Sequence, residues 1–110
     1  MKDRDRVMRT IVFFDLPNIY AQDKRNYLQF RKFLTSEGFI MMQESVYTKI
    51  VLNSVQANLL LKKIKKKAPK KGLIQLMTIT EKQFSQIKYI IGEPNSKIID
   101  NEERLIILWK

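Results

Sequence analysis

The most constraining feature of this sequence is a short run near its start that is apolar on both faces. Residues Thr10 to Phe14 read Thr-Ile-Val-Phe-Phe, rich in β-branched and aromatic side chains. A strand that alternates apolar and polar residues can lie at a surface, whereas one without that alternation needs a covering layer on each side. Pro17 cannot donate a ladder hydrogen bond, so the strand ends before it. We therefore expect this strand in the middle of a covered sheet.

Helical and extended patterns follow in a recognisable order. The predicted elements are a strand over 8–16, a helix over 23–37, extended segments over 39–42 and 46–52, a helix over 54–68 and a strand over 73–79. Asp23 and Ser54 are expected to cap the two helices, and Gly38 suits the end of the first. The two middle segments form either a hairpin or one long bulged strand. The order β-α-β-β-α-β predicts an α+β, ferredoxin-like fold with an antiparallel sheet.

The end of the chain is also rich in β-forming residues. It predicts a helical turn over 80–85, strands over 88–91 and 104–109, and a chain turn over 93–96. We expect one domain over residues 1–110, with a charged N-terminal extension over 1–7 and a C-terminal strand extension over 86–110. Because the first and last strands of the sheet alternate little, the face away from the helices also needs a cover. Either the C-terminal tail or a second copy, in a homodimer, supplies it.

Composition excludes several kinds of site. The sequence has no cysteine and no histidine, which removes disulfides, thiolate and imidazole metal ligands, and Ser–His catalysis. No apolar run approaches the roughly 20 residues of a membrane helix, and the charged N-terminus lacks the apolar region of a signal peptide. We expect a soluble, cytoplasmic protein that does not contact membranes. Any chemistry must come from carboxylates, hydroxyls, amines or a bound metal ion.

The charge of the chain is strongly positive and concentrated. There are 21 basic and 11 acidic residues, a net charge of +10. Seven lysines and no acid lie between Ser54 and Gly72, and the remaining 14 basic and 11 acidic residues leave only +3 elsewhere. Such clustering favours a polyanion, and lysines suit backbone contacts better than base readout. The alternative is a solvated helix face. The predicted nucleic-acid contacts are Lys62, Lys63, Lys65, Lys66, Lys67, Lys70, Lys71 and Arg31.

Asp15 is the main candidate for chemistry, because it closes an apolar strand and rigid strand ends aim functional carboxylates. The ordinary alternative is a turn residue that accepts from nearby backbone N–H groups. One carboxylate is a poor Mg²⁺ site, but two copies of Asp15 across a dimer axis could share one ion that activates water. Gln43 and Ser45 could donate to a phosphate or hold Asp15 in place; alternatively, they mark a bulge or tight strand junction.

A family resemblance rests on several short segments in a fixed order. They are Phe13-Phe14-Asp15-Leu16-Pro17, then Tyr27, Phe30-Arg31-Lys32-Phe33-Leu34, Gly38-Phe39 and Gln43-Glu44-Ser45-Val46-Tyr47. Over about residues 9–109 the sequence resembles the CRISPR-associated protein two family. The later run Ile79-Thr80-Glu81-Lys82-Gln83-Phe84 and the closing strand are similar to members from type II systems.

The resemblance implies a ferredoxin-like homodimer whose sheets face each other. It implies that Asp15 is the catalytic residue and metal ligand of a Mg²⁺-dependent endonuclease acting on RNA or DNA. It also implies a role in CRISPR adaptation, in which the dimer bridges two dimers of the integrase subunit and holds double-stranded protospacer DNA. From the residues alone, a ribosomal-type or regulatory RNA-binding module without catalysis stays open as the alternative.

Overall fold

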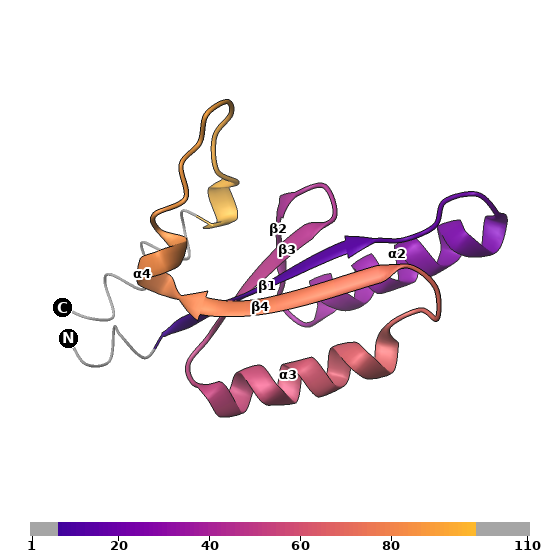
Figure 1. Ribbon diagram of the computed structural model, residues 1–110, viewed down its shortest axis with the longest axis horizontal. Helices are drawn as coiled ribbons and strands as arrows, with labels where there is room; N and C mark the ends of the chain where they lie inside the picture. The colour runs from indigo at the N-terminus through magenta and orange to yellow at the C-terminus, as the bar shows by residue number, and fades with distance from the viewer. Residues whose placement is uncertain (1–6, 99–110) are drawn as a thin grey trace.

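The computed structural model describes residues 7–98, which form a four-stranded antiparallel sheet with helices along it (Figure 1). The strands lie in the order β2-β3-β1-β4. The elements are β1 (Met8–Asp15), α2 (Ala21–Ser36), β2 (Ile40–Gln43), β3 (Val46–Val51), α3 (Ser54–Lys67), β4 (Leu73–Thr80) and α4 (Glu81–Phe84). The predicted ferredoxin-like α+β fold is confirmed, and the two middle segments form a hairpin.

Strand β1 lies in the centre of the sheet, as its apolar composition predicts. It pairs with β3 on one side, from Met8 to Phe13, and with β4 on the other, from Met8 to Asp15. Its side chains alternate between the two faces of the sheet. Val12 and Phe14 enter the core beneath the helices, whereas Ile11 packs on the opposite face. A layer on each side of β1 explains why the strand shows no polar face.

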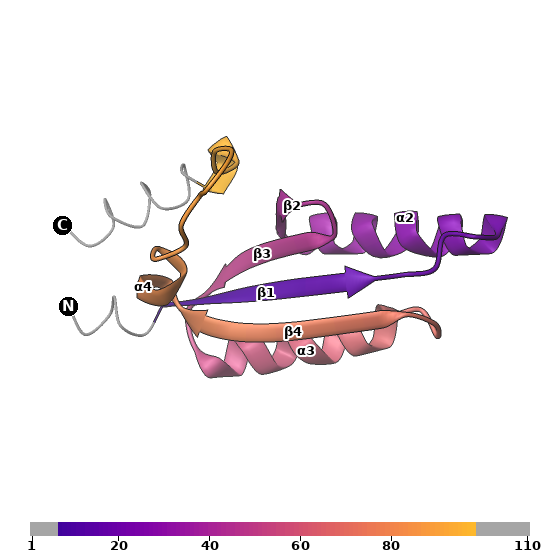
Figure 2. The ribbon, with the colours of Figure 1, turned by 45° about the horizontal axis from the view of Figure 1, so that its top comes forward.

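Both long helices pack on one face of the sheet. Phe30 and Leu34 of α2 and Leu60 and Ile64 of α3 are buried against the sheet, with Phe14 between them. The ring of Phe14 meets Phe30 edge-on, with centroids 5.2 Å apart. The N-terminal end of α2 and the C-terminal end of α3 lie at the same end of the molecule as the tip of β1 (Figure 2). This end therefore brings together the predicted carboxylate and the last lysines of α3.

The predicted helix caps are wrong by a few residues. Helix α2 has Tyr20 at its N-cap, and Asp23 lies three positions inside it, accepting bonds from the backbone N–H groups of Ile19 and Tyr20. Asp23 thus satisfies the helix start from within the first turn, where its charge also suits the helix dipole. For α3 the cap is Asn53, whose side chain accepts from the Gln56 amide at 2.9 Å.

The turn between β2 and β3 combines a bulge with one strained residue. The register shifts between Met41 and Gln43, and the two-residue turn at Glu44 and Ser45 follows. Ser45 has a φ of +64°, a left-handed conformation that side chains other than glycine adopt at a cost. Its carbonyl accepts from the Phe14 amide at 3.0 Å. This bond fixes the turn against the end of β1.

The sheet face opposite α2 and α3, called here the open face, is covered at one end by the C-terminal part of the chain. Phe84 and Ile98 are buried there against Ile11. After α4 the chain rises beside the β2–β3 hairpin (Figure 1), and Asn95 donates from Nδ2 to the Met41 carbonyl at 2.9 Å. The tail therefore covers part of the open face, as one of the two predicted covers.

The strand predicted over 88–91 is wrong. This segment has no regular structure, and Ile90 and Ile91 are 90% and 93% exposed. It pairs with no strand among residues 7–98, and β-rich composition alone cannot form a strand without such a partner. The predicted helical turn over 80–85 is confirmed by α4. The predicted strand over 104–109 lies outside the described residues, as does the charged segment 1–6.

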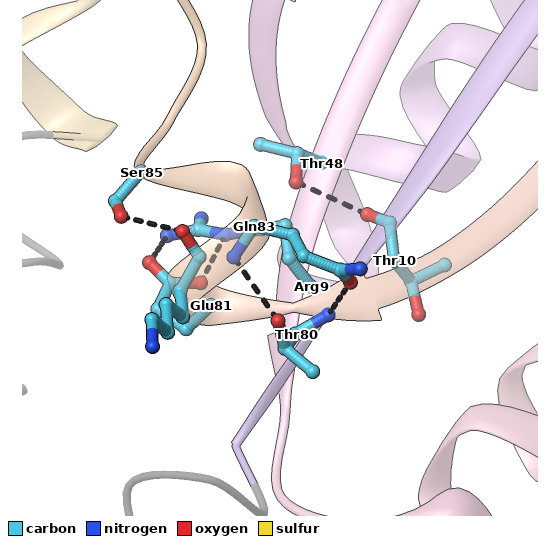
Figure 3. Close-up of polar contacts among 8 residues, drawn as sticks. Arg9, Thr10, Thr48, Thr80, Glu81, Gln83 and Ser85 are labelled. Carbon is cyan, nitrogen blue, oxygen red and sulfur yellow. Dashed lines mark hydrogen bonds and ion pairs between the residues drawn. The ribbon is translucent and has the colours of Figure 1, made fainter.

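An ion pair joins the start of β1 to α4 on the open face (Figure 3). Arg9 is fully buried and donates from Nε to Glu81 Oε2 at 2.9 Å and from Nη2 to Glu81 Oε1 at 2.5 Å. Its guanidinium carbon also lies 4.1 Å from the centre of the Phe84 ring. The Glu81 amide donates to the Val7 carbonyl at 3.1 Å. Side-chain and backbone bonds together hold α4 on the open face.

Within residues 7–98, no helix combines the length and the hydropathy needed to cross a membrane.

Candidate functional site

Asp15 is the last residue of β1 and is exposed on the open-face side of the strand. Because Val12 and Phe14 point to the helix side, alternation directs Asp15 with Ile11 and Phe13 to the opposite side. Its backbone pairs with Leu73 of β4. Its carboxylate makes no hydrogen bond or ion pair within the described part of the chain. The turn-capping alternative for Asp15 is therefore not what the structure has.

The backbone at Asp15 is held by a close approach of the loop before β4. Gly72 has a φ of +106°, and a Cβ built on it would lie 2.8 Å from the Asp15 carbonyl oxygen and 2.9 Å from Leu16 Cδ2. Only glycine combines this conformation with this proximity. The position of Asp15 thus depends on the end of the lysine-rich loop.

Asp15 borders a cleft of about 460 Å³ at the end of β1. The residues around it come from the β1–α2 loop, α2 and the β2–β3 turn. They are Asp15, Leu16, Asn18, Lys24, Tyr27, Leu28, Glu44 and Ser45. We call this hollow the Asp15 cleft. It brings three segments together that lie up to 30 positions apart in the sequence.

The predicted supporting residues behave differently. Ser45 lines the Asp15 cleft, and its carbonyl holds the Phe14 amide next to Asp15. Gln43 is exposed at the end of β2 and does not line the cleft. The bulge between Met41 and Gln43 is the physical reason, because it interrupts the alternation of side chains before the turn. The alternative interpretation of this stretch, a bulge, is correct for Gln43.

Glu44 is a site residue that sequence reasoning passed over. It lines the Asp15 cleft and accepts from the Tyr27 hydroxyl at 2.5 Å. Burial and this hydrogen bond to Glu44 raise the pKa of Tyr27 above its ordinary value. The phenol therefore stays protonated at neutral pH and donates to the carboxylate. No spacing in the sequence indicates this pair, since Tyr27 and Glu44 are 17 positions apart.

Arg31 lies on the exposed side of α2, with the hydroxyl of Tyr47 in β3 as its neighbour. The Tyr47 hydroxyl, first by its charge when ionised and then by hydrogen bonding, raises the pKa of Arg31. The guanidinium is thus permanently charged and lies near the β3 side of the sheet. The side chain is exposed, and its contact with a phosphate stays a prediction.

The Asp15 cleft offers oxygen donors suited to Mg²⁺, but too few in one copy. Carboxylates of Asp15 and Glu44, the Asn18 amide and the Ser45 hydroxyl are hard ligands of the kind that Mg²⁺ takes. Among residues 7–98, no three acidic or other metal-binding side chains group closely enough to hold a metal ion by themselves. The residues fit an ion that keeps several waters or takes a second carboxylate from another copy.

The lysines of α3 do not form a single row. Residues three or four apart share a side of a helix, so Lys62 and Lys66 point outward, Lys63 and Lys67 lean toward α2, and Lys65 lies on the other flank. All of them are exposed, as are Lys70 and Lys71. Lys63 is paired at 3.2 Å with Glu37, the residue that follows α2, which reduces the availability of Lys63 to a ligand. The structure thus brings the predicted lysines to one end of the helix layer but on several sides.

A ferredoxin-like sheet with a free carboxylate at the end of its first strand and a lysine-rich helix defines a class of small basic α+β proteins. Comparison with known proteins gives the family. Residues 8–87 match the family described as CRISPR associated protein Cas2. The match spans most of the chain, so the chain belongs to the Cas2 family.

Curated relatives and a solved structure agree with this assignment. The chain is 46% identical over 101 residues to the CRISPR-associated endoribonuclease Cas2 of Treponema denticola, covering 92% of this chain and 100% of the relative. It is also 46% identical to the protein of the same name from Streptococcus mutans, covering 92% and 93%. A solved structure titled "Crystal structure of cas2" matches with a TM-score of 0.58 at 19% identity, covering 82% and 92% of the two chains. The predicted family resemblance is confirmed.

Proposed function

We propose that this protein is a metal-dependent endoribonuclease that works as a homodimer, and that it serves as a nucleic-acid-binding subunit in CRISPR adaptation. The observation that carries the proposal is the free Asp15 carboxylate, exposed at the end of the central strand on the face of the sheet that the helices do not cover. The relatives named endoribonucleases support the reaction class.

The open face supports dimer formation. Met77 pairs with Ile11 and Leu73 pairs with Asp15 across the β1–β4 ladder, so these side chains share a face. Leu73 and Met77 are 55% and 47% exposed, and Phe13 on the same face is also only half-buried. Apolar side chains left uncovered on a sheet favour association. A second copy packed on this face by a twofold axis would bring the two Asp15 ends toward each other.

Asp15 from each copy would hold the ion, which we propose is Mg²⁺, and Glu44 and Ser45 line the same cleft. Bound there, it would neutralise charge on the scissile phosphate and lower the pKa of a water ligand. The protein itself fixes the carboxylates, because β1 pairs with β4 up to Asp15 and with β3 up to Phe13. Lys24 in the same cleft attracts the phosphate.

The second candidate is a scaffold that holds double-stranded DNA and docks an integrase subunit without cutting. The exposed lysines of α3 and the loop to β4 favour it, since they suit sequence-neutral phosphate contacts. So does the absence of a three-group metal cluster among residues 7–98. Both roles need a dimer and a polyanion surface, so they are compatible in one protein.

The decisive experiment measures cleavage of a labelled single-stranded RNA with Mg²⁺ and with excess chelator. Asp15→Asn keeps the shape of the side chain and removes its charge, and we expect it to lower the rate by at least about 100-fold. Glu93→Gln is the matched control, because Glu93 is an exposed acid that does not line the Asp15 cleft. Equal cleavage by wild type and Asp15→Asn would remove the catalytic proposal.

Light scattering tests dimer formation, and binding to a duplex tests the proposed contacts with nucleic acid. We expect a dimer in solution, and a duplex affinity that falls with salt by about 0.9 log units per log unit of salt for each phosphate contacted. A monomer with salt-independent binding would contradict both the catalytic and the scaffold role. Binding without cleavage would leave the scaffold role alone.

A further inference from the structure

A groove runs between α2 and the C-terminal end of α3, on the helix side of the molecule. Two adjoining hollows of about 460 and 510 Å³ form it, and both are lined by Asn26 and Pro69. Lys67 lines the first hollow, and Lys70 and Lys71 line the second. The groove is separate from the open face and from the Asp15 cleft, with which it shares no lining residue. The catalytic site proposed above does not include it.

One wall of the groove is a row of amide side chains. Gln22, Asn26 and Gln29 follow one another along α2 at spacings of four and three, which places them on one side of the helix. Gln22 donates to Asn26 at 2.8 Å, so part of the row is already ordered. Amides both donate and accept, and can therefore serve phosphates, sugar hydroxyls and base edges alike.

The other wall is cationic and largely unneutralised. Lys67, Lys70 and Lys71 form no ion pair with any residue in the described range 7–98, in contrast to Lys63, which pairs with Glu37. The acid in this groove, Asp23, accepts from two backbone N–H groups through Oδ2 and belongs to the helix start. Lys32 lines the first hollow from α2 and also forms no ion pair in this range, so the groove offers four cations to a ligand that carries regularly spaced negative charge.

We propose that this groove binds one strand of polynucleotide, an inference that rests on the proposed function and assigns it a strand path. The two hollows, of about 460 and 510 Å³, have the size of small-molecule sites, so they can take up nucleotide units of a single strand, whereas a duplex would touch only their rims. Phe30 at its floor is 2% exposed and offers no ring for stacking, whereas Tyr20 lines the second hollow, is 68% exposed and offers one, and stacking accepts any base. Contacts from lysines and amides therefore make the binding sequence-neutral. The amide row favours a nucleic acid over an acidic peptide, since it matches sugar and base polarity as well as charge.

The test compares two triple variants of equal charge. Lys67→Gln/Lys70→Gln/Lys71→Gln changes the groove, and Lys62→Gln/Lys65→Gln/Lys66→Gln changes the outer sides of α3. Affinities for labelled single-stranded RNA, single-stranded DNA and a duplex are measured by fluorescence anisotropy across a salt series. We expect the groove triple to weaken single-strand binding by about tenfold or more and to reduce its salt slope by about 2. The outer triple should act mainly on the duplex.

A neutral double variant separates the groove from general electrostatics. Asn26→Ala/Gln29→Ala should weaken single-strand binding several-fold and leave the salt slope unchanged, with folding checked by thermal melting. Equal effects of both lysine triples on single strands, or tighter binding of a polyglutamate peptide than of RNA, would overturn the groove proposal. Duplex binding and Mg²⁺-dependent cleavage by the groove triple would then show that the proposed function survives. Loss of all nucleic-acid binding in the wild type would instead overturn the proposed function.

Discussion

Arg9 and Glu81, 72 positions apart, form a two-point ion pair that joins the central strand to the short helix α4. Arg9 is completely buried, and its remaining Nη1 has no hydrogen-bond partner among residues 7–98. Nearly all of the charge of this guanidinium is therefore balanced by one carboxylate. Removing the carboxylate would leave a buried cation without compensation.

We predict that Glu81→Ala lowers the free energy of unfolding by about 3–5 kcal/mol, the usual cost of breaking a buried pair from one side. Urea unfolding followed by circular dichroism measures it. Glu93→Ala, at an exposed acid, should stay within about 0.5 kcal/mol of wild type. The double variant Arg9→Met/Glu81→Leu should recover much of the loss, because no buried charge remains. The single variants Arg9→Met and Glu81→Leu are measured beside it. A loss of stability in the double variant equal to the sum of these two losses would contradict this explanation.

Two glycines with similar backbone angles make a matched pair of variants. Gly72 and Gly92 have φ values of +106° and +91°, but a Cβ at Gly92 meets nothing within 4 Å. We predict that Gly92→Ala costs about 1–2 kcal/mol, the conformational term alone. Gly72→Ala should cost clearly more, because the methyl group collides with the Asp15 backbone. Thermal or urea unfolding of both variants checks the difference, and equal losses would show that the collision is relieved without cost.

The same pair tests the link between the lysine loop and Asp15. At temperatures where Gly72→Ala remains folded, we expect its Mg²⁺-dependent cleavage to fall while that of Gly92→Ala stays near wild type. Single-turnover rates on one RNA substrate measure this. Unchanged cleavage in a folded Gly72→Ala would show that the backbone contact does not position the carboxylate.

Asp15→Asn should separate function from stability. Because the carboxylate is exposed and has no partner within residues 7–98, we predict a change in the free energy of unfolding of less than about 0.5 kcal/mol. Urea midpoints with and without Mg²⁺ measure it, and the rate loss described above is read on the same preparations. A strongly stabilised variant would indicate that carboxylates repel across a dimer contact in the absence of metal.

Tyr27 should make the free energy of unfolding depend on pH in the alkaline range. Its pKa is raised, so the folded state favours the protonated phenol. The stabilisation is complete below the ordinary pKa of 10.0 and is lost as pH rises through the higher folded value. Tyr27→Phe should remove this part of the alkaline loss and cost at most about 1 kcal/mol at neutral pH.

Absorbance titration of the tyrosines, compared between wild type and Tyr27→Phe, gives the pKa of Tyr27 directly. Glu44→Gln should shift that pKa downward, since it removes the negative acceptor, while the part due to burial stays. An unchanged titration in Glu44→Gln would show that the hydrogen bond to Glu44 has no influence on the phenol.

The order of elements could be predicted from local pattern because each segment carries its own periodicity. The doubly apolar β1 predicted its central position, and Pro69 and Gly38 marked helix ends. The caps were displaced because Asp23 and Asn53 act through side-chain geometry that a sequence shows only as a preference. The strand predicted over 88–91 is wrong because a strand needs a neighbouring strand to pair with, and composition does not show whether one is present.

For the site, the sequence led to Asp15 and Ser45 but not to their surroundings. A strand end is a local feature, so Asp15 could be found from its position alone. Glu44, Tyr27 and Gly72 reach the same region only through the folding of the sheet and its crossings. The division of the lysines among different sides of α3 follows from helical spacing, but the ion pair between Lys63 and Glu37 needs the placement of α2.

Asp15 takes its place from the β1–β4 ladder, in which it pairs with Leu73, and from the close approach of Gly72, rather than from contacts of its own side chain. Apart from Gly72, a residue anchored in this way makes few demands on the identity of its neighbours. The β1–α2 loop could therefore change in length and chemistry, and alter which polymer or partner is accepted, while the Asp15 carboxylate stays where the sheet puts it. The scaffold leaves recognition free to diversify around a fixed point.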